Sequence, residues 1–275
     1  MSLPPVSVFT DLVNTYLPEP HALLLNGILL GTPVKSDPAL YKLLKEVGLL
    51  HLVVLSGMNI SILASTCMQL AGKISRKIAL VITAIFICIF ICFVGFQAPI
   101  VRSALMYYFT SVGIWIGKRS LSFLSLIVSG LVIMLVWPEW ISTLSFQLSY
   151  AATIGLILFS PRRESSPKTE ERGFRLQIIS MVKAELQLSL AAQVFTAPLI
   201  FIYFKQISLI SPVANILVAW TIAPLMFFGG LTLILGKIAF VLGIIPAFLS
   251  YGLLTYILWV ITFLSHIPFS FISLP

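Results

Sequence analysis

The chain is built from long apolar runs separated by short polar turns. Two of these runs, at residues 78–96 and 121–137, are apolar on every face of a helix. A helix of about 20 apolar residues spans the hydrocarbon core of a bilayer, and a helix with no polar face is either buried or in contact with lipid. These runs restrict the chain to a helical membrane protein.

We therefore predict an all-α fold, a polytopic integral membrane helical bundle of about eight transmembrane segments with broken or re-entrant helices. The composition agrees with this fold, because 59% of the residues are hydrophobic and 9% are charged, against roughly 25% charged residues in a soluble domain. The predicted segments begin at residues 49, 78, 100, 121, 140, 186, 207 and 238.

The run at 207–235 is too long for one simple span. Its prolines, Pro212 and Pro224, predict either one kinked helix or two half-helices. The whole chain then divides into an N-terminal lead at 1–20, a short apolar or interfacial segment with a polar loop at 21–48, a transmembrane domain at 49–265 and a tail at 266–275.

Basic residues predict the orientation. Lys and Arg accumulate in cytoplasmic loops of membrane proteins, so the net charge of +8 does not by itself indicate nucleic-acid binding. The longest polar loop, 160–185, holds six of the 17 basic residues. We expect this loop to be cytoplasmic and the protein to be a multi-pass protein of the cell (inner) membrane.

No sequence motif indicates a cofactor or a metal. The three cysteines, at positions 67, 88 and 92, lie in apolar runs without partners at metal-site spacing. Dinucleotide-binding, phosphate-binding-loop and zinc-protease motifs do not occur. We expect no cofactor, no metal and no enzymatic activity.

The run at 49–65, LLHLVVLSGMNISILAS, keeps several polar residues inside a span. Polar groups in hydrocarbon cost free energy unless they find partners or water. On a regular helix, His51 and Asn59 share one face, and Ser56-Gly57 favours close helix approach or local unwinding. We expect one wall of a polar path or a helix–helix seam. A Ser56–His51 pair would indicate an intramembrane hydrolase, but a spacing of five places the two side chains on different faces of a helix.

Arg102 lies two residues inside the segment that begins at residue 100. A charge at the bilayer centre costs about 3 kcal/mol on insertion scales and marks a functional site by default. The alternative is that Arg102 snorkels from the start of the helix to the headgroups. Gln97 nearby favours a polar pocket.

Further polar side chains fall on the segments that begin at 140, 186 and 207. A single polar residue of this kind more often forms a hydrogen bond between packed helices than a functional site. Together, on helices that alternate with apolar ones, they indicate a polar interior lined by four or five helices. The residues are Gln147, Ser149, Gln193 and Asn215.

Taken in order, these motifs resemble the membrane competence domain of the ComEC family, the inner-membrane channel for DNA uptake. The resemblance covers about residues 22–235 and rests on GILLG at 27–31, GLLH at 48–51, LSG at 55–57, GF through VRSA at 95–104, SFQLSY at 145–150 and SPVAN at 211–215. The family usually has a second His shortly after the Ser-Gly pair, where this chain has Asn59. Many full-length members also carry an OB-like and a metallo-β-lactamase-like domain, and we expect this chain to correspond to the competence-type channel domain alone.

The resemblance implies an inner-membrane channel that translocates single-stranded DNA into the cytoplasm during natural transformation. The implied partners are single-stranded DNA, the lipid bilayer and other competence proteins, namely a DNA receptor, a nuclease and a cytoplasmic motor. The oligomeric state stays open. The residues expected to line the path are His51, Ser56, Gly57, Asn59, Gln97, Arg102, Gln147, Ser149, Gln193 and Asn215.

Three other functions are compatible with the residues. The interrupted run at 207–235 is typical of a small-solute secondary transporter, although no internal repeat accompanies it. An intramembrane hydrolase would use Ser56. A scaffold would carry no transport at all. If the chain is a channel, we expect Asn59→Leu and Gln193→Leu to insert normally, because leucine is tolerated in a bilayer. Each change should remove water from the path and abolish DNA uptake.

Overall fold

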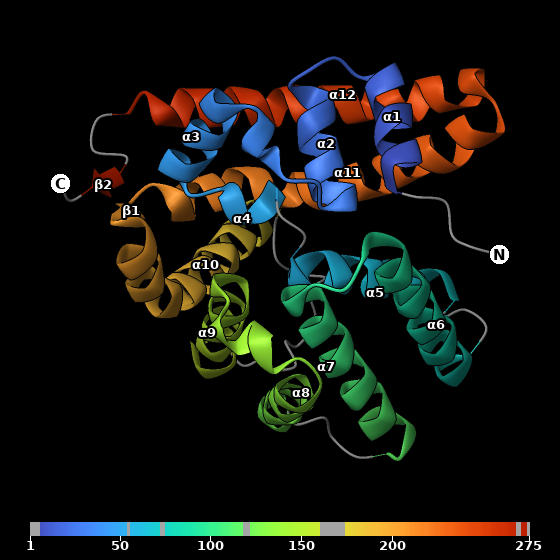
Figure 1. Ribbon diagram of the computed structural model, residues 1–275, viewed down its shortest axis with the longest axis vertical. Coiled ribbons are helices and arrows are strands. Elements are labelled where there is room, and N and C mark those ends of the chain that lie inside the picture. Colours follow the sequence, from blue (N-terminus) through green and yellow to red (C-terminus); the bar gives the residue numbers. More distant parts are fainter. Residues whose placement is uncertain are drawn as a thin grey trace.

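The computed structural model describes residues 6–53, 56–71, 75–117, 122–159, 174–267 and 271–273 (Figure 1). Within these residues the chain is almost entirely helical, and the predicted all-α membrane bundle is confirmed. The first elements are α1 (Val6–Tyr16), α2 (His21–Leu30), the 3-10 helix η1 (Val34–Ser36), α3 (Pro38–Val47) and α4 (Leu50–Val53).

The rest of the chain forms longer helices and one small sheet. The middle elements are α5 (Gly57–Ala71), α6 (Arg76–Val94), α7 (Ala98–Trp115), α8 (Ser122–Val136), the 3-10 helix η2 (Pro138–Ser142) and α9 (Leu144–Phe159). The last elements are α10 (Phe174–Phe204), β1 (Gln206–Ser208), α11 (Ser211–Ile238), α12 (Phe240–Ser265) and β2 (Phe271–Ser273).

Four helices in the described part of the chain are long and apolar enough to cross a membrane. They are α6, α11, α12 and the Val182–Phe204 part of α10. Helices α2, α8 and α9 are apolar but shorter. Each of the eight predicted segments holds helix, yet several of these helices are too short to span a bilayer alone, because about 20 residues are needed.

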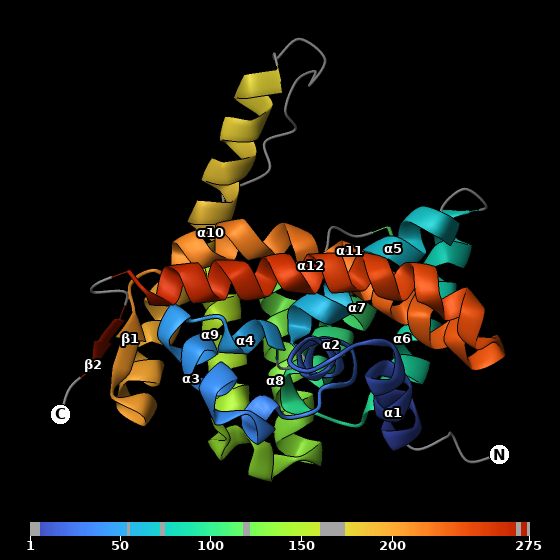
Figure 2. The same cartoon turned by 90° about the horizontal axis from the view of Figure 1, so that it is seen from above.

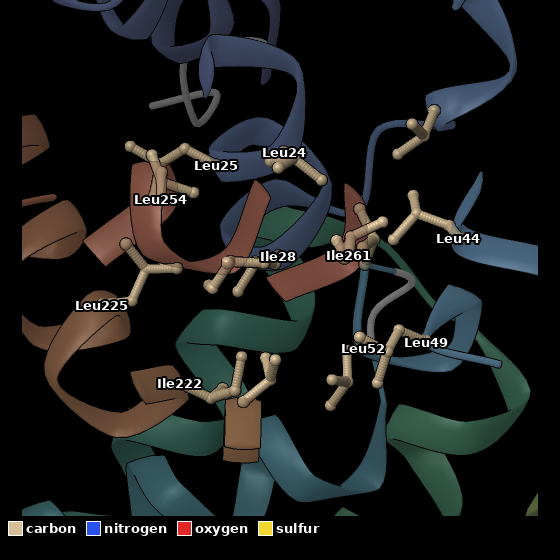
Figure 3. Close-up of a cluster of buried hydrophobic side chains, with 14 of the residues drawn as sticks. Leu24, Leu25, Ile28, Leu44, Leu49, Leu52, Ile222, Leu225, Leu254 and Ile261 are labelled. Carbon is tan, nitrogen blue, oxygen red and sulfur yellow. The ribbon is translucent and has the colours of Figure 1, made fainter. Parts of the chain in front are cut away.

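One hydrophobic core surrounds α2. Helices α11 and α12 run side by side as an antiparallel pair, and α1, α2 and α3 pack on this pair (Figures 1 and 2). Nearly every residue of α2 is buried, and Leu25 and Ile28 lie among Leu225 of α11 and Leu254 of α12 (Figure 3). The 21–31 run, expected to be interfacial or re-entrant, therefore forms the centre of a protein core.

A second core lies between α5, α6, α7 and α8. It contains Ile60, Ile87, Ile100 and Ile133, each at most 1% exposed. The opposite faces of α6 and α8 expose large apolar side chains such as Phe86 and Leu131. An inner face packed on protein and an outer face left apolar is the pattern of a helix at the edge of a membrane bundle.

The polar region at 32–48 is helical rather than a loop. Asp37 caps α3, because its Oδ1 accepts hydrogen bonds from the backbone N–H groups of Ala39 and Leu40, both at 3.0 Å. Pro38 occupies the first turn, and Gly48 ends the helix at φ 79°. These are the usual start and stop signals of a helix.

Two predicted boundaries are wrong. The 49–71 segment is not one helix, since α4 ends at Val53 and α5 begins at Gly57. Helix α10 begins at Phe174, inside the predicted loop at 160–185, and its first part projects from the body of the molecule (Figure 2). The rest of that loop, residues 160–173, lies outside the described residues.

Of the two alternatives for the run at 207–235, the structure has one helix rather than two half-helices, and the tail contains a strand. Helix α11 is a single helix with Pro224 inside it, and α12 continues through Pro246. The tail is tied to the bundle, because β2 pairs antiparallel with β1 in the register Gln206↔Ser273 and Ser208↔Phe271.

Candidate functional site

Arg102 is the centre of one group of polar side chains, the Arg102 cluster, which comprises Gly57, Arg102, Ser103, Met106, Ser149 and Tyr150. Pro99 in the first turn of α7 sets the start of the helix one turn before Arg102. The guanidinium donates from Nε to Ser149 Oγ on α9 at 2.8 Å and from Nη2 to Ser103 Oγ at 2.9 Å. It is 7% exposed, so it does not snorkel to the surface of the protein.

The charge of Arg102 has no carboxylate partner in the described part of the chain. Its Nη1 donates to the thioether sulfur of Met106 at 3.0 Å, and its Cζ lies 5.9 Å from the centre of the Tyr150 ring. Between described residues the ion pair that forms is Lys42–Glu46, on the exposed side of α3. Because thioethers and rings are weak acceptors, the positive charge of Arg102 is solvated by the protein but not neutralised.

Helix α5 begins directly against this cluster. A Cβ placed on Gly57 would lie 2.7 Å from Arg102 Nη2 and would overlap Ser103 Oγ, so a larger residue there would have to displace one of these side chains. Ser103 is held in turn by a 2.9 Å hydrogen bond from its Oγ to the carbonyl of Pro99. The start of a helix carries partial positive charge, which adds to that of Arg102. The start of α5 and the buried guanidinium of Arg102 therefore produce a region of positive electrostatic potential.

Tyr150 closes the far side of the Arg102 cluster. Its hydroxyl lies 3.1 Å from Ser129 Oγ of α8, and its ring lies 4.3 Å from that of Phe146. Ser129 is fully buried. Helices α7, α8 and α9 thus meet through hydroxyl groups.

A second polar group, the α10–α11 junction, joins α3, α10, β1 and α11. It comprises Gly48, Ser189, Gln193, Gln206, Ser208, Ser211, Pro212 and Asn215. Gln193 Nε2 donates to the carbonyl of Ser208 at 3.0 Å, and Asn215 Nδ2 donates to Ser189 Oγ at 2.8 Å. Ser211 Oγ donates to the carbonyl of Gly48 at 3.4 Å.

Asn59 and Ser56 lie at the seam between α5 and α2. Asn59 is 1% exposed, and its Nδ2 donates to the carbonyl of Ile28 at 2.9 Å. That carbonyl belongs to the last turn of α2, where carbonyls lack partners within the helix. Ser56 Oγ donates to Asn59 Oδ1 at 3.4 Å. These contacts match the predicted helix–helix seam.

His51 lies apart from Ser56. It is exposed on α4, and its Nδ1 lies 3.0 Å from the carbonyl of Gly48. The shared face predicted for His51 and Asn59 does not exist, because the helix is interrupted between them. Between the described residues, Ser56 Oγ donates to Asn59 Oδ1 and His51 Nδ1 contacts the carbonyl of Gly48, rather than each other.

The remaining predicted residues lie at the ends of α7 and α9. Gln97 is the half-buried residue before α7, and its side chain does not cap that helix. Gln147 Oε1 accepts from Tyr203 Oη of α10 at 3.1 Å. The structure thus brings Gly57, Arg102 and Ser149 together, and separately Gln193 and Asn215.

Three contacting residues were not among the predicted site residues: Ser103, Met106 and Ser208. Met106 shares a helix face with Arg102 at a spacing of four, and Ser103, the next residue, accepts a hydrogen bond from Arg102 Nη2. Ser189 stands four residues before Gln193, and this spacing predicts the helix face that the two residues share. Ser208 lies in a short strand that no sequence pattern indicates.

Comparison with known proteins places the chain in a family. The family model described as "Competence protein" matches residues 28–275. ComE operon protein 3 of Bacillus subtilis (strain 168) is 24% identical over 210 residues, which are 74% of this chain and 25% of that protein. This chain therefore matches about a quarter of the length of that relative. No solved structure matches the chain. The chain is a membrane protein that belongs to the competence protein family.

Proposed function

We propose that this chain forms a membrane channel that passes single-stranded DNA into the cytoplasm during natural transformation. Membership of the competence protein family supports a role in DNA uptake. The observation that carries the channel proposal is Arg102, a buried cation in a membrane bundle whose described partners are two hydroxyls, a thioether and an aromatic face.

A channel for a polyanion needs attraction without tight binding. A cluster of many bases would hold the phosphates strongly and in a salt-dependent way. One uncompensated guanidinium, next to the start of α5, offers a phosphate a single charged contact that can be made and broken. The apolar outer faces of α6 and α8 contact lipid.

The partners and orientation belong to the same proposal. Membership of the competence protein family supports a role beside other competence proteins, and we assign to those partners the capture of DNA, the removal of one strand and the supply of energy. The loop at 160–185 faces the cytoplasm, in accordance with its basic residues. The chain itself conducts the strand and does not cut it.

Uptake of labelled DNA tests the role of Arg102. Arg102→Ala should abolish the nuclease-resistant internal pool of label while the amount of protein in the membrane stays normal. Arg102→Lys should restore part of the uptake, because a charge remains but the fork that reaches Ser149 and Ser103 together is lost. The matched control is Lys77→Ala. Lys77 is a basic residue at the start of α6, and its ammonium lies over the ring of Trp115 at the end of α7. Full uptake in Arg102→Ala, or equal loss in Lys77→Ala, would contradict the proposal.

The second function that an observation favours is transport of a small anionic solute. Discontinuous helices whose ends face the substrate are common in secondary transporters, and the break between α4 and α5 lies beside Arg102. In that case Arg102→Ala would abolish uptake of the solute and leave DNA uptake unchanged.

A further inference from the structure

The α10–α11 junction contains buried polar atoms that lack a partner. In the described residues, buried side-chain atoms without a hydrogen bond include Gln193 Oε1, Gln206 Nε2, Ser208 Oγ and Asn215 Oδ1. These four fall between residues 193 and 215, on α10, β1 and α11. Native proteins leave few buried polar atoms unpaired, and an accumulation in one place calls for a missing partner.

Hydrogen bonds and close packing hold these residues in one network. Gln193 donates to the carbonyl of Ser208, and Asn215 donates to Ser189, which lies one turn before Gln193 on α10. Gln206 and Ser208 are two residues apart on β1, so their side chains lie on the same side of the strand. A Cβ built on Gly48 would lie 3.0 Å from Ser208 Cβ, which closes the network against α3.

The chemistry of the unpaired atoms identifies the missing partner. Gln193 Oε1 and Asn215 Oδ1 can only accept a hydrogen bond, Gln206 Nε2 can only donate one, and Ser208 Oγ can do both. A cation would satisfy the two acceptors but would be repelled by the amide donor. An anion would satisfy only the donors. Water donates two hydrogen bonds and accepts others, and buried waters commonly make about three bonds to such groups.

We infer that the α10–α11 junction binds water inside the bundle, bridging Gln193, Gln206, Ser208 and Asn215. Water there gives the unpaired atoms of α10, β1 and α11 the partners that they lack. The site lies beside the start of α11, away from the packed seam of Asn59. For its role as the wetted part of a path, the inference rests on the proposed channel function.

Reaction of a buried thiol with a water-soluble reagent tests the inference. Cys67, Cys88 and Cys92 are first replaced by alanine, and Ser208→Cys is then compared with Ser250→Cys in purified protein in lipid nanodiscs, where both membrane faces are open. The two serines are similarly buried, at 8% and 0% exposure, but Ser250 Oγ already donates to the carbonyl of Pro246 at 2.9 Å. A small charged thiosulfonate should modify Ser208→Cys much faster than Ser250→Cys. Equal, slow modification of both would overturn the inference.

Hydroxyl-radical footprinting of the unmodified protein gives an answer even where Ser208→Cys does not fold. Radicals formed from bound water oxidise the side chains nearest to it. Pro212 of the junction should be oxidised faster than Pro246 of α12, although both are buried. Equal protection of the two prolines would mean that the junction is dry. Neither measurement uses DNA, so hydration of the junction and the DNA channel can fail separately.

Discussion

Gly57 at the start of α5 is in direct contact with Arg102 of α7. The space for a side chain at position 57 is filled by the guanidinium and by Ser103, since a Cβ on Gly57 would lie 2.7 Å from Arg102 Nη2. The helix break, the missing side chain and the buried cation therefore depend on one another. The contact also explains why a glycine stands at position 57 in an apolar run.

Gly57→Ala should be destabilising. The added methyl group must displace Ser103 or Arg102, and overpacking of this kind costs about 1–3 kcal/mol. The melting temperature of the purified protein should fall, and DNA uptake should fall with it. Gly252→Ala in α12 is the matched control, because no atom lies within 4 Å of its Cβ position. A melting temperature unchanged by Gly57→Ala would contradict the packing described for the Arg102 cluster.

Asn59→Leu should also be destabilising, contrary to the expectation from sequence that leucine is tolerated there. The structure uses the Asn59 amide to satisfy the carbonyl of Ile28, and a buried carbonyl left without a partner costs about 1–3 kcal/mol. Thermal unfolding of the purified variant measures the loss. The exposed Ser61→Ala on the same helix should change stability by less than about 0.5 kcal/mol. Equal stability of Asn59→Leu and the wild type would favour the original expectation.

The orientation of the chain predicts the labelling of two cysteines. In a cysteine-free background, Ser165→Cys in the basic loop should resist a membrane-impermeant thiol reagent in intact cells, because that loop is expected to be cytoplasmic. Ser36→Cys, which is exposed in η1, should react. Ready reaction at position 165 with protection at position 36 would invert the topology.

Several helices could be predicted from sequence because their signals are local. The runs at 78–96 and 121–137 became α6 and α8 within two residues at either end, since an all-apolar run has no alternative in a bilayer. Pro99 marked the start of α7. The sequence also contains the start signal of α3, Asp37-Pro38, and its stop signal, Gly48. The region was nevertheless predicted to be a loop because many of its residues are polar.

Other features depend on distant contacts and could not be predicted. Periodicity treated 49–71 as one helix, whereas the Ser103 and Arg102 side chains occupy the space beside Gly57 at the start of a second helix. The β1–β2 pair joins residues about 65 positions apart in three-residue strands, too short to show a pattern. Arg102 was predicted to be functional from its charge, but its bond to Ser149, 47 residues away, was not.

The most direct measurement of the central claim follows labelled double-stranded DNA into cells that have the gene, lack it, or lack it and carry it on a plasmid. The channel account predicts that cells without the gene still bind DNA at the surface but contain no nuclease-resistant single strand in the cytoplasm. The plasmid should restore that strand. Cytoplasmic single strand at wild-type levels in cells without the gene would contradict the account.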